Sequence, residues 1–232
     1  MIEIYMVNTV GSCETKYWQK KWIPIKKSLI LTSKQKAVII GSLLGDGTMR
    51  IGKGAKNANL KTEHGLEQKK YVEWKYHILK SFVFTKPKIS YRNEENGGKY
   101  PKSWWFRTIR HPILTEIYKQ FYLGEGYRNG RKIIPLNIKN DFTPLVLAVW
   151  IMDDGSYSRG IIDISTYSFS LQEIYYLQEC LKEKFKIEAT FYKDRDKGYR
   201  MYCRKKETNK LISIIYPYII PSMMYKIGFA TP

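Results

Sequence analysis

A short apolar segment that ends in Asp-Gly occurs twice in the sequence, and it constrains the fold more than any other feature. The first copy covers residues 39–47 with the sequence IIGSLLGDG, and the second covers residues 147–155 with the sequence LAVWIMDDG. A helix that is apolar on every side must be buried on every side. Because the final Gly ends such a helix, each copy predicts a carboxylate at the edge of a core.

The two carboxylates, Asp46 and Asp154, lie 154 − 46 = 108 residues apart, which predicts a duplicated unit. If the two apolar helices pack together, they bring the two acids side by side. A single Asp-Gly is a common turn, and alone it would indicate nothing more. The pair favours an active site, because each copy follows an apolar run and precedes a predicted strand.

Hydrophobic periodicity in the rest of the chain predicts the order α-β-β-α-β-β-α twice, within an α+β fold. The first half shows a helix start at Thr32 or Ser33, alternation over 49–51 and 60–63, a helical stripe at Val72, Tyr76, Leu79 and Val83, a hairpin turn over 96–98 and a helix from Pro112. The second half shows a helix from Pro144, alternation over 161–165, a capping box from Ser170 to Glu173, a hairpin with a return strand to Arg204, and a helix over 211–216.

Changes in composition divide the chain into four predicted segments. Residues 1–31 form a basic, aromatic extension, and residues 32–126 form the first half. Residues 127–143 form a linker that is rich in basic residues and shows no clear period, and residues 144–232 form the second half.

The charge balance indicates the class of partner. The 232 residues include 40 Lys and Arg against 21 Asp and Glu, a formal net charge of +19. Such an excess favours a polyanion, either nucleic acid or an anionic membrane surface. No apolar run reaches transmembrane length without a charge, so we expect nucleic acid and no membrane. Cys13, Cys180 and Cys203 are scattered, which argues against a disulfide framework or zinc site and for a reducing compartment.

The repeated segment resembles the nine-letter motif of the LAGLIDADG homing endonucleases, and two copies in one chain resemble their single-chain, intron-encoded type. The matching residues are Gly41, Asp46 and Gly47 in the first copy, and Leu147, Ala148, Ile151, Asp154 and Gly155 in the second.

Both copies depart from the motif at its sixth letter, where Leu44 and Met152 replace an Asp. The resemblance places the metal ligand at the Asp before the final Gly, so this departure leaves the chemistry intact. Val149 also replaces a Gly that packs against the partner helix, and we expect Gly41 to supply the room instead.

The resemblance implies two pseudo-symmetric halves with a central two-helix interface and saddle-shaped, DNA-binding β-sheets. It further implies a double-strand break in a long DNA target by phosphodiester hydrolysis across the minor groove, which leaves short 3′ overhangs. Mg²⁺, with Mn²⁺ as a substitute, would relieve the repulsion between Asp46 and Asp154. The backbone carbonyls of Gly45 and Asp153 are implied as supplementary ligands.

Two lysines, Lys132 and Lys226, resemble the paired lysines of single-chain members, since one lies near the end of each half. A lysine beside an activated water can polarise it or stabilise charge on the phosphorus. The apolar residues before Lys226 indicate a tethered side chain. Arg131 or Lys139 could take the place of Lys132.

For DNA binding, the candidates are basic and aromatic residues on the outward faces of the predicted strands, which can enter the major groove on either side of the cut. They are Arg50, Lys61, Arg92, Lys102, Arg107, Arg159, Lys193, Arg195, Arg200, Tyr202 and Arg204. An exposed strand residue is often merely solvated, so the prediction rests on the group.

The preferred function is a monomeric, Mg²⁺-dependent, site-specific DNA endonuclease. The alternative is an intron maturase that binds its host intron RNA without cutting, or another non-cleaving binding protein of the same fold. Retention of both acids favours the endonuclease. We expect an intracellular protein, and the richness in Lys, Ile and Tyr fits an organelle, either mitochondrion or chloroplast, or a bacterial cytoplasm.

Overall fold

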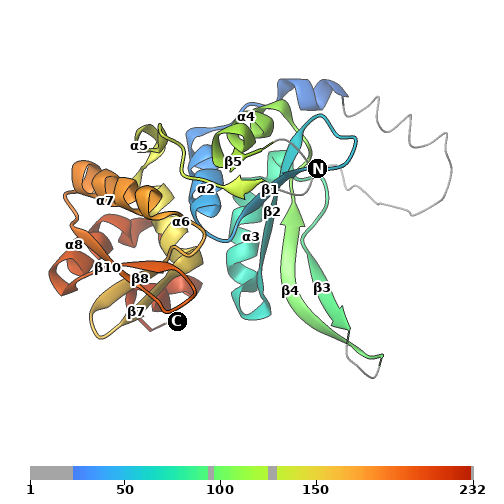
Figure 1. Ribbon diagram of the computed structural model, residues 1–232. Helices are drawn as coiled ribbons and strands as arrows, with labels where there is room; N and C mark the ends of the chain where they lie inside the picture. The colour runs from blue at the N-terminus through green and yellow to red at the C-terminus, as the bar shows by residue number, and fades with distance from the viewer. Residues whose placement is uncertain (1–22, 94–96, 125–129, 231–232) are drawn as a thin grey trace. The chain divides into compact units, whose positions relative to one another are not determined.

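The computed structural model describes residues 23–93, 97–124 and 130–230 of the chain. The chain divides into two compact units, residues 1–30 and residues 31–232. In the first unit, residues 23–28 form a helix. The rest of the predicted extension up to residue 22, which includes Cys13, lies outside the described residues. The second unit contains both predicted halves (Figure 1).

Each half has the predicted order α-β-β-α-β-β-α, which confirms the α+β fold. The first half consists of α2 (Ser33–Leu44), β1 (Thr48–Ile51), β2 (Ala58–Gly65), η1 (Leu66–Gln68), α3 (Lys69–Ile78), η2 (Lys80–Phe82), β3 (Lys88–Asn93), β4 (Lys99–Arg107) and α4 (Pro112–Phe121). The second half consists of α6 (Pro144–Asp154), β7 (Gly155–Ser158), β8 (Ile161–Ser165), α7 (Leu171–Phe185), β9 (Ala189–Lys193), β10 (Tyr199–Cys203), α8 (Lys205–Ile215), η3 (Tyr216–Tyr218) and η4 (Pro221–Ile227).

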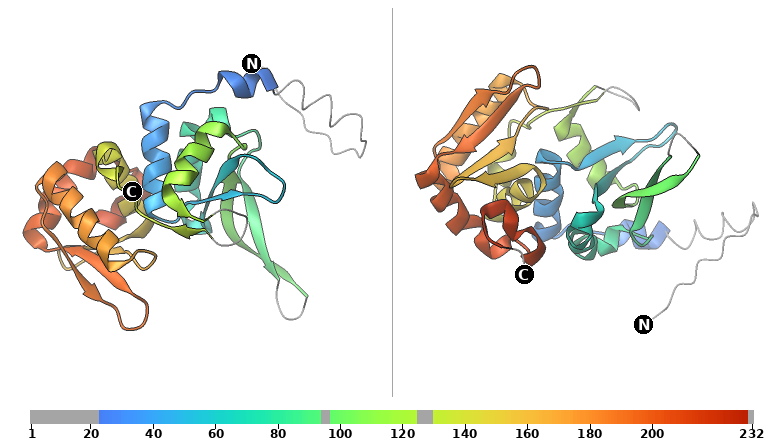
Figure 2. Two further views of the ribbon diagram at one scale, coloured as in Figure 1. Left: turned by 45° about the horizontal axis from the view of Figure 1, so that its top comes forward. Right: turned by 90° about the horizontal axis from the view of Figure 1, so that it is seen from below.

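The two four-stranded sheets have equivalent topology. Their strand orders are β1-β2-β4-β3 and β7-β8-β10-β9, and every neighbouring pair is antiparallel. In both sheets, the second strand of the first hairpin pairs with the second strand of the second hairpin, namely β2 with β4 and β8 with β10. The same unit is therefore present twice. Figures 1 and 2 show one sheet on each side of the central helices α2 and α6.

Side-chain caps begin both central helices. Thr32 accepts a hydrogen bond from the Gln35 N–H at 3.2 Å and forms a capping box with it, and Thr143 accepts from the Val146 N–H at 3.3 Å. From Val146 to Met152 every residue of α6 has no exposed surface. No helix in the described ranges is both long and apolar enough to cross a membrane.

Gly41 of α2 and Gly45, the C-cap of α2, make room for side chains of α6, so the helices approach closely. A Cβ at Gly41 would lie 2.6 Å from the Val149 Cβ, and a Cβ at Gly45 would lie 2.4 Å from the Asp153 Cβ. Both distances are far below van der Waals contact. The expectation that Gly41 compensates for Val149 is therefore confirmed, and Gly45 makes room for Asp153 in the same way, a helical turn further along.

Helix boundaries differ from the prediction in two places. Helix α3 ends at Ile78, so Val83 lies outside it, and Tyr76 is only half-buried. The buried face of α3 instead includes a lysine, Lys75, which the hydrophobic stripe did not indicate. Helix α8 covers Lys205–Ile215, so it begins six residues before the predicted range of 211–216. Arg204 is its N-cap residue and is not part of β10.

The described residues of the predicted linker are ordered structure. Residues Arg131–Lys132 form β6, which pairs with β5 (Tyr122–Leu123), and Ile138–Asp141 form α5. The Ile134 N–H donates to Glu173 Oε1 at 2.9 Å, which ties the segment to α7 of the second half. Short strands and single helical turns contain too few residues to show a hydrophobic period, which explains why the sequence did not indicate them.

The substitution Gly41→Ala tests the close approach of the two helices. We expect it to lower the free energy of unfolding by about 1–3 kcal/mol, because the added methyl overlaps Val149 and the Val146 carbonyl oxygen. Urea denaturation followed by tryptophan fluorescence measures the change. Lys34→Ala, at an exposed position of the same helix, is the control and should change it by less than about 0.5 kcal/mol. Equal stability of both variants would contradict this packing.

Candidate functional site

Asp46 and Asp154 lie at the C-terminal ends of the two central helices. Asp46 follows Gly45, the C-cap of α2, and Asp154 is the last residue of α6. Partial burial raises the pKa of both carboxyls, although 49% of the Asp46 side chain is exposed. Repulsion from Asp153 adds to the shift of Asp46, and repulsion from Asp46 and Asp153 brings the pKa of Asp154 to about 7. The Asp46 N–H also donates to Asp153 Oδ2 at 3.2 Å, so the structure places acids from both halves beside each other.

Lys132 and Lys226 make equivalent contacts with the two Asp-Gly turns. The Lys132 Nζ donates to the carbonyl oxygens of residues 45 and 47, at 2.7 and 3.0 Å. The Lys226 Nζ donates to those of residues 153 and 155, at 3.1 and 2.9 Å. Burial lowers the pKa of both ammonium groups. Each turn therefore combines one acid with one partly desolvated lysine.

The two alternatives to Lys132 lie elsewhere. Arg131 pairs with Glu173 at 2.9 Å, and Lys139 pairs with Glu183. Strand β6 explains the difference, because its antiparallel pairing with β5 places Lys132 directly opposite Tyr122. The Tyr122 hydroxyl in turn accepts from the Met49 N–H at 2.9 Å, just beyond the first Asp-Gly turn.

The donor set at these turns fits a hard divalent cation. Two carboxylates that repel each other gain most from a cation between them, which favours oxygen ligation of Mg²⁺. The carbonyls of Gly45 and Asp153 already accept from Lys132 and Lys226. A carbonyl oxygen has two lone pairs, so each retains one for a further partner.

A buried polar cluster that the sequence reasoning missed lies beneath the two turns. The Asp153 carboxylate, which has no exposed surface, accepts from Lys75 Nζ and from the Tyr71 hydroxyl, both at 2.7 Å. His64 Nε2 lies 3.7 Å from Asp153 Oδ1, and His64 Nδ1 lies 3.6 Å from Asp46 Oδ2. Burial, with the charge of Lys75, lowers the pKa of His64 to about 4.

Two weak sequence features could have indicated this cluster. Lys75 lies three residues after Val72 and four before Leu79, on the apolar stripe of a predicted helix, where a lysine is unusual. His64 continues the inward alternation of Leu60 and Thr62 in β2. Both positions are compatible with ordinary burial, and only the fold shows that they meet one carboxylate.

A pocket of about 500 Å³ opens beside Asp46. Residues of the first sheet form most of its lining, which consists of Asp46, Thr48, Lys61, Glu63, His64, Gly65, Lys102 and Ser103. Glu63 accepts from Lys61 and Ser103, and these hydrogen bonds lower the pKa of Glu63 against the effect of its burial. The acid of the first turn is therefore open to the outward face of this sheet.

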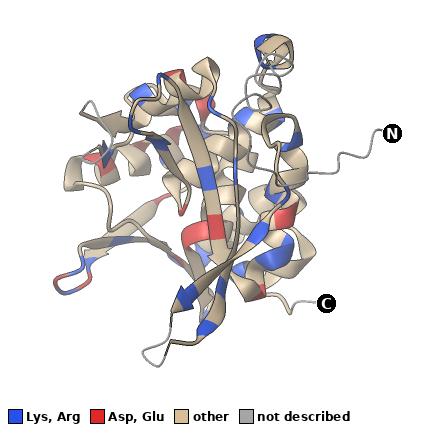
Figure 3. Ribbon diagram, turned by 90° about the vertical axis from the view of Figure 1, so that its right-hand side faces the viewer, with Lys and Arg blue, Asp and Glu red and all other residues tan. Residues whose placement is uncertain are grey.

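The five candidate DNA-binding residues of the first half lie on its strands. Arg50 is exposed on β1, and Lys61 of β2 pairs in register with Arg107 of β4. Arg92 and Lys102 are exposed on the β3–β4 hairpin, which extends beyond the helices (Figure 1). Figure 3 shows basic residues along the strands of this half.

The six candidates of the second half are less uniform, because four of them lie outside the outward strand faces on which they were predicted. Arg200 and Tyr202 lie on the outward side of β10, opposite the buried Met201 and Cys203. Lys193 pairs with Tyr199, on the same side of the sheet as Met201, so it is not on the outward face. Arg204 is exposed but follows β10 as the N-cap residue of α8.

Two further arginines of the second sheet lie in turns. Arg159 and Arg195 have left-handed backbones, with φ of 51° and 47°, at the tips of the β7–β8 and β9–β10 hairpins. Arg200 forms an ion pair with Asp163, and its hydrogen bonds with Tyr167 and Asp163 raise its pKa although burial opposes this. Outward charge on this sheet is therefore partly neutralised within the protein.

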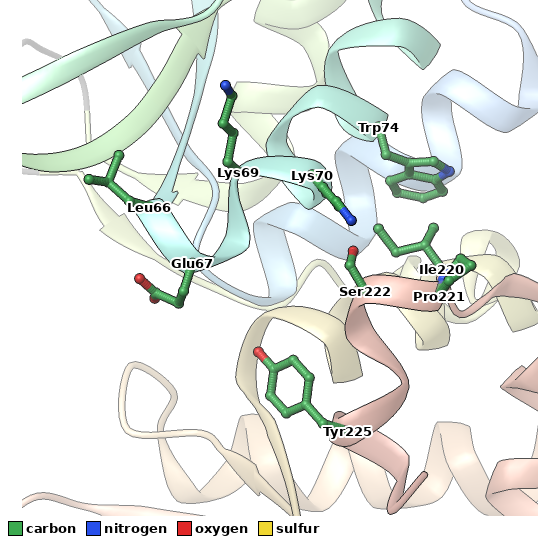
Figure 4. A pocket seen from close by; sticks show the side chains of 9 residues that line it. All are labelled: Leu66, Glu67, Lys69, Lys70, Trp74, Ile220, Pro221, Ser222 and Tyr225. Carbon is green, nitrogen blue, oxygen red and sulfur yellow. The ribbon is translucent and has the colours of Figure 1, made fainter. Parts of the chain in front are cut away.

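A second groove, of about 880 Å³, lies between α3 and η4 (Figure 4). Trp74, Ile220 and Pro221 form its apolar end, and Lys69 and Lys70 lie along the α3 side. The Gln68 Nε2 donates to the Tyr225 hydroxyl at 2.8 Å across it. This contact links η1, which directly precedes α3, to η4, the element that carries Lys226.

Two equivalent halves, joined at paired Asp-Gly turns with one lysine each, define a pseudo-two-fold protein with its polar site at the junction. The family model that matches residues 36–211 is described as the LAGLIDADG DNA endonuclease family. The chain belongs to this family, as its motifs indicated.

Individual relatives agree with this assignment. The chain is 31% identical over 195 residues to the cytochrome b mRNA maturase bI2 of Debaryomyces hansenii, which covers 82% of this chain and 72% of that protein. It is 30% identical over 209 residues to the DNA endonuclease I-ChuI of Chlamydomonas applanata, with coverage of 85% and 96%. The structure of the homing endonuclease I-WcaI bound to its DNA recognition sequence matches with a TM-score of 0.78 at 25% identity, covering 89% of this chain and 92% of that one.

The raised pKa of Asp154 predicts how stability changes with pH in the absence of metal. The ordinary value is 3.8 and the folded value is about 7, so the folded state binds the proton more tightly than the unfolded state. The free energy of unfolding should therefore fall as the pH rises from about 4 to about 7 and level off above, by on the order of 1–4 kcal/mol.

Urea denaturation in EDTA across this range measures the effect, with Asp154→Asn as the control. The variant lacks the titrating carboxyl and should lose less stability over the same interval. Parallel stability curves for the two proteins would contradict the assigned shift.

Proposed function

We propose that the chain is a site-specific homing endonuclease that makes a double-strand break in a long DNA target by divalent-metal-dependent hydrolysis, leaving short 3′ overhangs. The observation that supports this most is the equivalence of the two turns. Each presents an acid, Asp46 or Asp154, and each has a lysine on the two carbonyls that flank that acid. Two like sites across a pseudo-two-fold axis suit one cut in each strand of a duplex.

Asp46 and Asp154 are the metal ligands in this proposal, with the backbone carbonyls of Gly45 and Asp153 as supplementary ligands. Mg²⁺ is the expected ion and Mn²⁺ a substitute. When bound, such an ion activates water and stabilises the leaving 3′-oxygen. Burial raises the pKa of both carboxyls and repulsion from neighbouring carboxylates adds to it, so a bound cation would offset both costs of ionisation.

Lys132 and Lys226 are the proposed catalytic lysines. Their contacts with the turn carbonyls fix each ammonium group beside one acid. There it can polarise the attacking water or stabilise negative charge on the scissile phosphate. Partial burial strengthens both effects, because solvent screens the charge less.

The proposed partner is double-stranded DNA, bound by a monomer through the outward faces of both sheets. The basic strand residues of the first half and the hairpin-tip arginines of the second support this. I-WcaI, whose fold this chain shares, was solved on its DNA recognition sequence. Phosphate contacts would position the duplex, and the exposed strand residues would contact base edges.

A maturase function is the second candidate, supported by the likeness to the cytochrome b mRNA maturase bI2. Such a protein would bind its host intron RNA, and it would have no need of two neighbouring acids each with a lysine. The two functions are compatible in one chain. The same likeness supports an intron of an organelle or a bacterium as the location of the gene. The sequence of the joined flanking exons would then be the DNA target.

The substitution Asp154→Asn tests the endonuclease. We expect it to abolish double-strand cleavage, because it removes a charged ligand from one turn, while affinity for the same DNA in Ca²⁺ stays within a few-fold. The assay is linearisation of a plasmid that carries the intronless exon junction, or of plasmids from a random-insert library, in Mg²⁺. Lys70→Met, at an exposed position of α3, is the matched control and should cut normally.

Cleavage by Asp154→Asn at the wild-type rate would refute the assignment of this residue. If wild-type protein linearises no plasmid in Mg²⁺ but promotes folding of an intron RNA, the maturase function is supported instead.

The salt dependence of binding tests the electrostatic contribution to the interface. If about ten phosphates are neutralised, the logarithm of affinity should fall against the logarithm of salt concentration with a slope near −9. Fluorescence anisotropy with a labelled target measures the slope. The double substitution Arg50→Gln/Arg107→Gln should make it shallower by about 2 if both side chains contact phosphates. An unchanged slope would exclude these two residues from the phosphate contacts.

A further inference from the structure

The buried cluster around Asp153 has no role in the chemistry proposed above, and it breaks the symmetry of the two turns. Residue 153 of the second turn corresponds to Gly45 of the first, since both precede the acid. Only the second turn therefore has an additional carboxylate. Its side chain crosses the helix interface and occupies the space that a side chain at Gly45 would need, with Asp153 Oδ2 2.8 Å from that Cβ position.

The two oxygens of the Asp153 carboxylate have different partners. Oδ1 accepts from Lys75 Nζ and from the Tyr71 hydroxyl, both on α3 at 2.7 Å. Oδ2 accepts from the backbone N–H of Asp46 at 3.2 Å. All of these partners belong to the first half, so one side chain of the second half connects α3 with the turn that carries the first acid.

Lys75 and Tyr71 contact each other and residues of both halves. The Lys75 Nζ lies 4.4 Å from the centre of the Tyr71 ring and 3.4 Å from His64 Nε2. The Tyr71 hydroxyl also lies 3.2 Å from the Val149 carbonyl oxygen of α6. Neither side chain of this pair has exposed surface, so they contact neither solvent nor a bound duplex directly.

We propose that Lys75 and Tyr71 are positioning residues, which act through the Asp153 carboxylate to hold the Asp46 turn in place against the Asp154 turn. This proposal rests on the proposed function, because the oxygens that it positions are those assigned to the metal. The restraint reaches the first acid through its backbone N–H, and the equivalent position of the first turn is a glycine. Loss of the restraint should therefore disturb the site of Asp46 more than the site of Asp154.

An ordinary buried ion pair would explain the same contacts by stability alone. Removing one partner of such a pair destabilises a protein, and removing both partners is often nearly neutral. Melting temperature therefore cannot separate the two roles. The separating measurements are local, namely hydrogen exchange of the Asp46 amide, affinity for Mn²⁺, and the relative rates of cutting the two DNA strands.

The test uses the full chain and the variants Lys75→Met, Tyr71→Phe and Lys75→Met/Asp153→Asn, with Lys70→Met as the control for the same change at an exposed site of α3. We expect Lys75→Met to speed exchange of the Asp46 amide and to weaken Mn²⁺ binding, each at least about tenfold. Tyr71→Phe retains the ion pair and should have a smaller effect of the same direction. If Lys75→Met does not fold, Tyr71→Phe alone tests the proposal by the same measurements. The double variant should recover the melting temperature lost by Lys75→Met but not the Mn²⁺ affinity.

Cleavage supplies a third measurement, on a duplex with a different fluorophore on each strand. The ratio of the two strand-cutting rates should change at least fivefold in Lys75→Met and stay constant in Lys70→Met. If the variants melt at lower temperature but keep wild-type exchange at Asp46, wild-type Mn²⁺ affinity and the wild-type ratio, the cluster only stabilises the fold and the proposal is wrong. Exchange and Mn²⁺ binding need no DNA, so they judge the cluster even if wild-type protein cuts nothing.

Discussion

The close packing of α2 against α6 is the contact on which the rest of the structure depends. Gly41 of α2 and its C-cap Gly45 lie four residues apart, and Val149 and Asp153 lie four residues apart on α6. Each glycine makes room for one of these side chains, so side chains of α6 pack directly against the backbone of α2 and its C-cap. The two helix ends, and with them the two acids, are therefore close in space.

This interface brings acidic groups together in a partly buried site, which makes their ionisation unfavourable and explains why lysines lie beside them. Burial and mutual repulsion oppose ionisation of Asp46 and Asp154. Lys132 and Lys226 offset some of that repulsion, and burial lowers the pKa of both lysines. Deeper in the protein, Lys75 neutralises Asp153 at full burial. The positive charge of the molecule therefore acts at two levels, in the site itself and on the strands that face a polyanion.

The order of elements and the identity of the family could be predicted because each depends on local patterns. Apolar runs, alternation in the strands and the capping residues Thr32 and Ser170 are local, and they agree with the structure. The folded linker could not be predicted, because the two residues of β6 form a strand only through pairing with β5. Lys193 was assigned to the wrong face for a related reason, since the side of the sheet depends on the register with Tyr199.

The sequence by itself determined the duplication, the two acids and the basic character, because repeats, motifs and charge need no third dimension. Only the tertiary structure decided which of Arg131, Lys132 and Lys139 reaches the first turn, and that Lys75 and Tyr71 meet Asp153. These contacts join residues many positions apart in the chain, and no periodicity records them. The contacts of Lys75 and Tyr71 have one physical cause, since a carboxylate buried between the two halves requires a cation and a hydrogen-bond donor from the helix beside it.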